Sequence, residues 1–143
     1  MRTFLDGKSL FVTGGTGSLG QKLTKILLEE SGIRKMVIFS RDEYKQSVMA
    51  ERFGNDPRLR FYLGDVRDYD RLRMAMEGCH YLVHAAALKH VPLLEVNPFE
   101  AVKTNIYGAQ NVIAAAIDAN VNRVIALSTD KACSPINLYG ATK

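Results

Sequence analysis

The sequence contains few cysteines and no long apolar stretch. Cys79 and Cys133 are its two cysteines, and neither has a CxxC partner, which excludes a disulfide framework and a cysteine-based zinc site. A reducing cytoplasm is the simplest compartment for such a chain. No apolar stretch approaches the length of a membrane span, and the first residues, MRTFLDGK, lack the apolar core of a signal peptide. We therefore expect a cytoplasmic protein that is neither exported nor inserted into a membrane, and we predict no metal site.

Charged residues are not clustered by sign either. The 19 basic and 15 acidic residues give a net charge of +4, and the basic residues are interspersed among the acidic ones. This distribution does not indicate a nucleic-acid surface, and an anionic small molecule explains the balance as well. The sequence has no internal repeat, low-complexity segment or linker. A length of 143 residues, with 47% hydrophobic and 24% charged residues, is typical of one globular domain.

Short apolar runs rich in β-forming residues alternate with stretches of helical periodicity. Strands that are apolar nearly throughout and are joined by helices predict a parallel sheet that is buried on both faces. The fold class is therefore α/β, a doubly wound parallel sheet of the Rossmann type, with right-handed crossovers. A further helix begins at Tyr139, after the fifth strand. The five predicted strands lie at residues 8–13, 35–40, 60–65, 80–86 and 122–128.

The longest stretch between predicted strands indicates a helix that begins near Pro98, a residue suited to a first helical turn. Apolar residues recur there every three or four positions, which predicts one apolar face packed on the sheet. The residues of this predicted face are Val102, Ile106, Ala109, Ile113 and Ala116.

The segment VTGGTGSLG, residues 12–20, follows the first predicted strand and opens a helix. Its glycines fit GxGxxG from Gly15 or GxxGxxG from Gly14, and both spacings let a pyrophosphate approach the free amides of a helix N-terminus. A tight turn alone needs one or two glycines, whereas four occur here within seven residues. We therefore predict a dinucleotide site whose phosphate loop comprises Gly14, Thr16, Gly17, Ser18, Leu19 and Gly20.

The end of the second predicted strand, FSRDEYKQ, bears on the choice between NAD and NADP. Ser40, Arg41 and Lys45 suit a 2′-phosphate and hence NADP, although both cations could also lie on a solvated helix end. Asp42 could bind a ribose hydroxyl, but we favour a role as the cap of the next helix.

Two further predicted strands end in small or acidic residues. In GDVRD, Asp65 and Val66 are predicted to lie beside an adenine ring, and Asp68 to cap a helix. In AAAL, Ala85 and Ala86 offer small side chains where a nicotinamide ribose passes the backbone; close packing of helix on sheet would explain them equally well.

Tyr139 and Lys143 are four residues apart, so a helix would place the ammonium beside the phenol. A nearby cation lowers the pKa of a tyrosine and equips it as a general base toward an alcohol. YxxxK alone is a weak signal, but here it follows the fifth strand of a dinucleotide fold and the segment LSTD.

With these motifs the sequence resembles the short-chain dehydrogenase/reductase superfamily, in the extended branch that acts on nucleotide sugars. The resemblance spans essentially the whole chain. Its finer motifs, TGGTGSLG, FSRDE.KQ, GDVRD, HAAALKHVP, VKTNIYGAQNV and LSTDKA..PINLYGATK, are similar to those of the inverting UDP-N-acetylglucosamine 4,6-dehydratases, which begin the pseudaminic acid pathway. Related capsule-type enzymes carry methionine at the position of Tyr139, and the tyrosine favours the pseudaminic branch.

The resemblance implies a mechanism. Tyr139, assisted by Lys143, takes the proton of the sugar O4 hydroxyl while C4 gives hydride to NADP+, and Thr129 or Ser128 holds that oxygen. The new ketone acidifies C5.

In the next step of that mechanism, Lys131 removes the C5 proton and Asp130 protonates the departing 6-hydroxyl. Hydride returns to C6, and reprotonation from the opposite face inverts C5. Elimination needs an acid and a base together, and adjacent opposite charges titrate as a unit. Retaining dehydratases usually carry an acidic residue at the position of Lys131, so the lysine indicates inversion; a surface ion pair is the simpler alternative for the two side chains.

Other positions are assigned by the same resemblance. Lys89 is expected to contact cofactor or substrate, although a solvated loop lysine is the alternative. Asn105 matches the helix asparagine that organises the site, which a buried asparagine bonded to backbone would also do. Cys133 and Ser134 replace the family's more usual Ala-Asn. His80, His84 and His90 lack ligand spacing and are expected to be strand or loop residues.

Three functions remain open from the sequence. A UDP-N-acetylglucosamine 4,6-dehydratase needs Lys131, an epimerase of the same branch does not, and a dinucleotide-binding module needs neither turnover nor substrate. The resemblance implies a substrate that is UDP-N-acetylglucosamine or a related UDP-sugar, a homo-oligomer, and a separate C-terminal substrate domain. We expect residues 1–143 to form an incomplete NADP-binding Rossmann domain, truncated after the fifth strand, with weak NADP binding and no turnover by itself.

Overall fold

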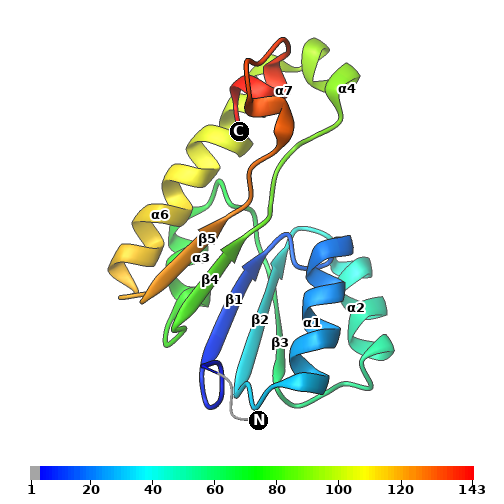
Figure 1. Cartoon of the computed structure of the whole chain (residues 1–143), viewed down its shortest axis with the longest axis vertical. Coiled ribbons are helices and arrows are strands. Elements are labelled where there is room, and N and C mark those ends of the chain that lie inside the picture. The colour runs from blue at the N-terminus through cyan, green and yellow to red at the C-terminus, as the bar shows by residue number, and fades with distance from the viewer. Residues whose placement is uncertain (1–3) are drawn as a thin grey trace.

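The computed structural model describes residues 4–143, which form one parallel five-stranded sheet in the order β3-β2-β1-β4-β5 (Figure 1). All four strand pairings are parallel, and Leu10 of β1 lies between Met36 of β2 and Tyr81 of β4. This order confirms the predicted doubly wound Rossmann fold and puts its switch point between β1 and β4. The strands are β1 (Ser9–Thr13), β2 (Lys35–Ser40), β3 (Leu59–Leu63), β4 (Tyr81–His84) and β5 (Arg123–Ala126).

Helices cover both faces of the sheet. Figure 1 shows α1 and α2 on one side and α3 and α6 on the other, as right-handed crossovers require. Shorter helices surround the upper end of the molecule, beyond the carboxyl ends of β4 and β5. The bounds are α1 (Ser18–Glu30), α2 (Glu43–Arg52), α3 (Tyr69–Met76), α4 (Val91–Val96), α5 (Pro98–Ala101), the π-helix η1 (Val102–Tyr107), α6 (Gly108–Asp118), the 3-10 turn η2 (Asp130–Ala132) and α7 (Leu138–Ala141).

Two apolar clusters form the core, one on each face of the sheet. Alternate residues of β1 supply both, because successive side chains of a strand point to opposite faces. Phe11 packs with Phe39, Leu72 and Val112, whereas Leu10 and its neighbours pack with the residues of α1 and β2. The strands β1 and β2 are therefore buried on both faces, as predicted. All four residues of β5 are exposed.

The predicted apolar face of the helix after Pro98 is wrong. Ile106 and Ile113 are 43% and 57% exposed, and of the predicted face only Ala116 is among the described residues that α6 buries. The reason is the π-helix η1, whose wider turn shifts the residues that follow it relative to a continuous α-helix. Small residues then allow a close approach, since a Cβ atom on Gly108 would lie 2.6 Å from Val66 Cγ2. The buried residues of α6 are Gly108, Val112, Ala115 and Ala116.

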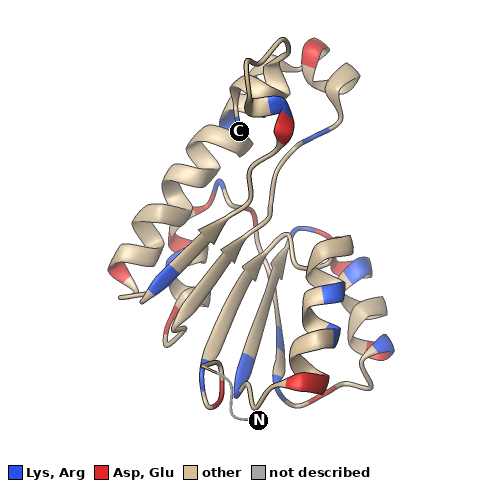
Figure 2. Ribbon diagram, viewed as in Figure 1, with Lys and Arg blue, Asp and Glu red and all other residues tan. Residues whose placement is uncertain are grey.

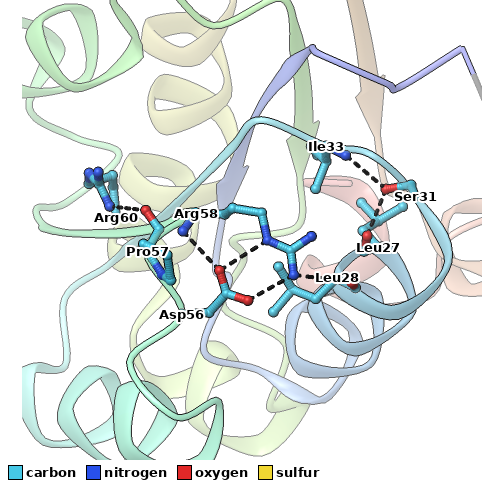
Figure 3. A network of polar contacts seen from close by, with 8 residues as sticks. All are labelled: Leu27, Leu28, Ser31, Ile33, Asp56, Pro57, Arg58 and Arg60. Atoms are coloured by element: carbon cyan, nitrogen blue, oxygen red, sulfur yellow. Dashed lines mark hydrogen bonds and ion pairs between the residues drawn. The ribbon is translucent and has the colours of Figure 1, made fainter.

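A polar network lies at the amino ends of the strands, where α1 ends and β3 begins (Figure 3). Arg58 donates to both carboxylate oxygens of Asp56 and to the Leu28 carbonyl, at 2.8 to 3.1 Å. A cation at that carbonyl also complements the C-terminal end of the helix dipole of α1. Salt-bridged in this way, Asp56 has a pKa below its ordinary value, chiefly because Arg58 donates to it.

Candidate dinucleotide cleft and catalytic edge

A cavity of about 610 Å³ opens at the carboxyl ends of β1, β2 and β3 and reaches the loop after β4. In doubly wound sheets this edge, beside the switch point, is where ligands bind. The structure thereby brings together most of the predicted cofactor residues from four separate segments. Those that line the cavity are Gly14, Thr16, Ser40, Arg41, Asp42, Lys45, Asp65, Val66 and Ala86.

The remaining predicted cofactor residues lie around this cavity instead of lining it. Ser18 and Leu19 open α1, and Tyr139 lies on α7 at the other end of the edge. Lys89 is exposed and lines an adjoining cavity of about 500 Å³, which shares Arg41 and Ala87 with the first. The predicted contact of Lys89 with a cofactor therefore stays a prediction.

The phosphate loop depends on glycine at specific points. Gly14 has a φ of +65°, and a Cβ atom there would lie 2.9 Å from the Ala86 amide nitrogen. A Cβ atom on Gly20 would lie 2.1 Å from the Gly15 carbonyl oxygen, so the first turn of α1 packs directly on the loop. The N-cap of α1 is Gly17, which has no side chain to occupy the helix N-terminus. That leaves its amides open to an anion, and a dinucleotide phosphate fits this cradle.

The loop is also braced from α1. Gln21 donates from Nε2 to the Thr16 carbonyl at 2.9 Å, and Gly17 donates its amide to the Gly14 carbonyl at 3.0 Å. Sequence inspection did not single out Gln21, because its role depends on one turn of helix folding back over the loop.

Cations and carboxylates alternate at the end of β2. Arg41 lies 3.6 Å from Asp65, and Lys45 lies 3.4 Å from Asp42. Asp42 also accepts the Lys45 amide at 2.9 Å, so it caps α2 as predicted. That amide is the main cause of a lowered pKa for Asp42. Both cations are largely exposed, with side chains that are 56% and 65% accessible, and a ligand can therefore reach them.

The loop after β3 is clamped from the helix that begins at Pro98. Asn111 donates to the carbonyls of Val66 and Arg67 at 3.2 and 2.9 Å. The Arg67 guanidinium in turn donates to Thr104 Oγ1 at 2.6 Å and lies 2.7 Å from a Glu100 carboxylate oxygen. Thr104 itself lines the cleft. Sequence inspection missed this clamp, since nothing in the local pattern shows that residues about 40 positions apart meet.

Asn105 joins the loop after β4 to the helix that carries Tyr139. Its side chain accepts from the Leu88 amide at 2.9 Å and donates to the Leu88 carbonyl and to Thr142 Oγ1, both at 3.0 Å. The residue is 6% exposed. Asn105 is therefore a buried asparagine that satisfies backbone groups of Leu88, and its predicted role in organising the site stays a prediction.

The predicted acid and base lie on the turn η2, directly after β5. Asp130 Oδ1 accepts from the Thr129 hydroxyl at 3.0 Å and from the Lys131 amide at 2.9 Å. The Thr129 bond is the main cause of a lowered pKa for Asp130, with the Lys131 charge next. Ser128, Asp130 and Lys131 are exposed. A substrate can therefore reach all three side chains.

The YxxxK pair stands where β5 leads into a short helix. Asn137 caps α7 through a bond from the Gly140 amide at 2.9 Å, and Gly140 is packed so closely that a Cβ atom would lie 2.0 Å from the Lys131 carbonyl oxygen. The turn that carries Tyr139 is thus pressed against the turn that carries Lys131. The predicted helical pairing of Tyr139 with Lys143 is not formed, because α7 ends at Ala141 and Lys143 lies beyond its C-cap. Partial burial lowers the pKa of Lys143.

Neither a metal cluster nor a membrane span is found in the part of the chain that the structure describes. Residues 4–143 contain no group of three or more His, Cys, Asp or Glu side chains placed to hold a metal ion. No helix within that range is long and apolar enough to cross a membrane.

The chain matches known proteins over nearly its whole length. A family model described as "Polysaccharide biosynthesis protein" matches residues 10–143. A UDP-N-acetylglucosamine 4,6-dehydratase (inverting) of Campylobacter jejuni subsp. jejuni serotype O:2 is 57% identical over 136 residues, which are 95% of this chain and 40% of the relative. A UDP-glucose 4-epimerase of Rickettsia conorii is 50% identical over 143 residues, which are 98% of this chain and 41% of the relative. The chain thus spans about two fifths of the length of these relatives.

Solved structures agree with the fold and cover a similar share. Pen from Bacillus thuringiensis superposes with a TM-score of 0.94 at 46% identity, over 99% of this chain and 43% of that one. DesIV from Streptomyces venezuelae, a dTDP-glucose 4,6-dehydratase with NAD bound, superposes with a TM-score of 0.85 at 30% identity, over 94% of this chain and 48% of that one.

Proposed function

The chain belongs to the polysaccharide biosynthesis protein family, and on that premise we propose that it is the dinucleotide-binding and catalytic part of an inverting UDP-N-acetylglucosamine 4,6-dehydratase. The observation that carries the proposal is the packing of two turns at the catalytic edge. Asp130 and Lys131 occupy the turn after β5, and the helix of Tyr139 rests on that same turn through Gly140. An acid, a base and a hydroxyl-activating phenol are thereby held within one short segment.

The charges of Asp130 and Lys131 are opposite to those that elimination needs. The lowered pKa makes Asp130 a carboxylate in the unliganded chain, whereas the acid that protonates the 6-hydroxyl must carry a proton. The charged and neutral forms of the two side chains differ by one proton moved between adjacent residues. A bound sugar desolvates both side chains, and desolvation favours neutral forms. We propose that substrate binding in this way supplies the neutral acid and base that elimination needs.

Tyr139 starts the proposed reaction by taking the proton of the O4 hydroxyl as a general base, a role in which the resemblance makes Lys143 its partner. Thr129 holds the same oxygen. A bound nicotinamide supplies hydride acceptance at C4 and hydride return to C6. Lys131 then takes the C5 proton, which the neighbouring ketone has made acidic, as Asp130 protonates the leaving hydroxyl. Return of a proton to the other face of C5 completes the inversion.

NADP is the proposed cofactor. Arg41 follows β2, Lys45 lies in the first turn of α2, and both line the cleft, which suits a 2′-phosphate. Each is already close to a carboxylate, so a 2′-phosphate has to compete with Asp65 and Asp42 for them. The phosphate loop and the bare N-terminus of α1 serve the pyrophosphate of either dinucleotide.

Replacing Lys131 tests the dehydratase against its runner-up. An epimerase, which the Rickettsia conorii relative favours, needs Tyr139 and Lys143 but no base at residue 131. In the full-length protein that contains this chain, we expect Lys131→Ala to lower the rate of water loss from UDP-N-acetylglucosamine by at least about 100-fold, the range of a general base. Mass spectrometry of the sugar nucleotide measures it. Unchanged turnover in Lys131→Ala would sink the dehydratase assignment. The control for a general loss of positive charge is Lys25→Ala, because Lys25 is an exposed lysine of α1 outside the predicted site.

A further inference from the structure

Thr13, the last residue of β1, has three hydrogen-bond partners on its hydroxyl. The amides of Ala85 and Ala86 approach Thr13 Oγ1 at 3.1 and 3.2 Å, and His84 Nδ1 lies 2.7 Å from it. Thr13 is fully buried and His84 is 5% exposed. Water therefore has little access to this cluster, and each bond has to be made within the protein.

Counting protons fixes the state of the imidazole. A hydroxyl has one hydrogen to donate and two lone pairs that accept. The Ala86 amide donates to one lone pair of Thr13 Oγ1, and the Ala85 amide shares its hydrogen between the second lone pair and the Thr13 carbonyl, which lies 3.2 Å away. With both lone pairs engaged, the hydroxyl hydrogen points to His84 Nδ1. That nitrogen must then accept, which requires a neutral ring whose proton is on Nε2. Burial lowers the pKa of His84 to about 4, with the Lys143 charge acting in the same direction, and the ring is neutral accordingly.

The two amides held by Thr13 belong to the wall of the dinucleotide cleft. Ala86 lines the cavity, and the space beside Gly14 is so tight that a Cβ atom there would lie within 3.1 Å of Ala85 and Ala86 backbone atoms. The Thr13 carbonyl and the buried Thr13 hydroxyl together hold this wall beside the phosphate loop. The hydroxyl alone holds the Ala86 amide, and its orientation is set by His84.

We propose that His84 is a positioning residue of the dinucleotide site, acting as a neutral imidazole that accepts from Thr13 and so leaves the Thr13 oxygen free to hold the Ala85 and Ala86 amides. This role rests on the proposed function, because it matters only if a dinucleotide occupies the cleft. It differs from the catalytic roles, since His84 acts through Thr13 and touches no reacting atom.

The imidazole spectrum gives the first test. In the full-length protein that contains this chain, labelled with 15N at histidine, the signal that disappears in His84→Asn belongs to His84. We expect that signal to show a protonated Nε2 and an unprotonated Nδ1 at neutral pH. A proton on Nδ1 would overturn the proposal, since the Thr13 oxygen would then have to accept from the ring.

Dinucleotide affinity gives the second test, with matched variants. His84→Leu removes the acceptor, and we expect it to weaken NADP binding about tenfold, the equivalent of one buried hydrogen bond. His84→Asn keeps an oxygen near the place of Nδ1, and we expect it to stay within about threefold of the parent protein. The control is His80→Leu, because His80 Nδ1 accepts from the Ser9 amide at 3.2 Å, at the other end of β1; NADP affinity should not change.

Thr13 supplies a second pair of variants in case His84→Leu does not fold. Thr13→Ser keeps the hydroxyl and should bind NADP as the parent does, whereas Thr13→Val should weaken binding at least as much as His84→Leu. If folded Thr13→Val and His84→Leu proteins both bind NADP normally, the positioning role is wrong. If the parent protein bound neither NADP nor NAD, the proposed function would fail, and the imidazole spectrum would still decide the protonation of His84.

Discussion

At the scale of single residues, Gly14 lacks a side chain for two separate reasons. Its φ of +65° disfavours any other residue, and the backbone of Ala86 leaves no room for a Cβ atom. Gly78 has a similar φ of +67° with nothing within 4 Å of its Cβ position, so it shares the first reason alone. Comparing Gly14 with Gly78 therefore separates the cost of backbone strain from the cost of crowding at the cleft.

We expect Gly78→Ala to lower the free energy of unfolding by about 1–2 kcal/mol, the cost of a left-handed alanine. Gly14→Ala should cost about 1–3 kcal/mol more, because the new methyl group presses on rigid backbone. It should also abolish dinucleotide binding, whereas Gly78→Ala should not. Urea unfolding and an NADP titration measure both effects. Equal losses of stability in the two variants would show that the contact at Ala86 is not tight.

His84 predicts how stability depends on pH. Its pKa falls from 6.5 to about 4 in the folded chain, so the unfolded chain binds a proton more readily. The contribution of His84 to stability is therefore complete above about pH 6.5 and is lost as the pH falls toward about 4. From the shift we expect a loss of about 3 kcal/mol over that range. Urea unfolding at several pH values should show this loss of unfolding free energy in the parent chain and a smaller loss in His84→Asn. Equal losses in the two proteins would show that His84 is not the source.

At the scale of elements, the strands could be predicted closely and the longest helix could not. Runs such as KMVIFS read as buried strands because apolar β-forming residues stand between turn-forming ones, and the structure places β2 at that run. The buried face of the helix after Pro98 was predicted wrongly because a periodicity of 3.6 residues per turn assumes an unbroken α-helix. Residues Val102–Tyr107 form a π-helix instead.

That π-helix holds the two ends of the site with adjacent residues. Thr104 binds Arg67 on the predicted adenosine side, and Asn105 binds Leu88 and Thr142 on the predicted catalytic side. The sequence pointed to Asn105 through a motif, but Arg67 and Thr104 carried no local signal. Most predicted cofactor residues that follow directly on the first three strands line one cavity. Lys89, which lies farther along the loop after β4, lines a neighbouring cavity.

Asn105 of the π-helix η1 and Asn111 of α6 test the division between the two ends. Asn105→Ala should leave the Leu88 backbone groups and Thr142 without partners, and we expect it to cost about 1–3 kcal/mol of stability and to lower kcat in the full-length protein. Asn111→Ala should affect the Val66 and Arg67 carbonyls instead, and so raise the KM for the dinucleotide with little change in kcat. Steady-state kinetics separate the two. If both variants changed kcat alone, the division would be wrong.

At the scale of the whole molecule, the sheet order decides where the chemistry lies. Because all four strand pairings are parallel, the carboxyl ends of the five strands lie at one edge of the molecule. The order β3-β2-β1-β4-β5 then lets loops that are far apart in sequence share a cleft. The opposite edge carries the Asp56 and Arg58 network, and the charged residues elsewhere are mixed in sign (Figure 2). One edge of the molecule therefore concentrates the predicted binding and catalytic residues.

We propose that the residues at this edge catalyse the elimination of water from a nucleotide sugar. The most direct test incubates the full-length protein that contains this chain with UDP-N-acetylglucosamine in heavy water and examines the product by mass spectrometry and NMR. We expect a 4-keto-6-deoxy sugar nucleotide that has lost one water, carries deuterium at C5 and is inverted at that carbon. A product of unchanged composition, epimerised at C4 and free of deuterium, would contradict it.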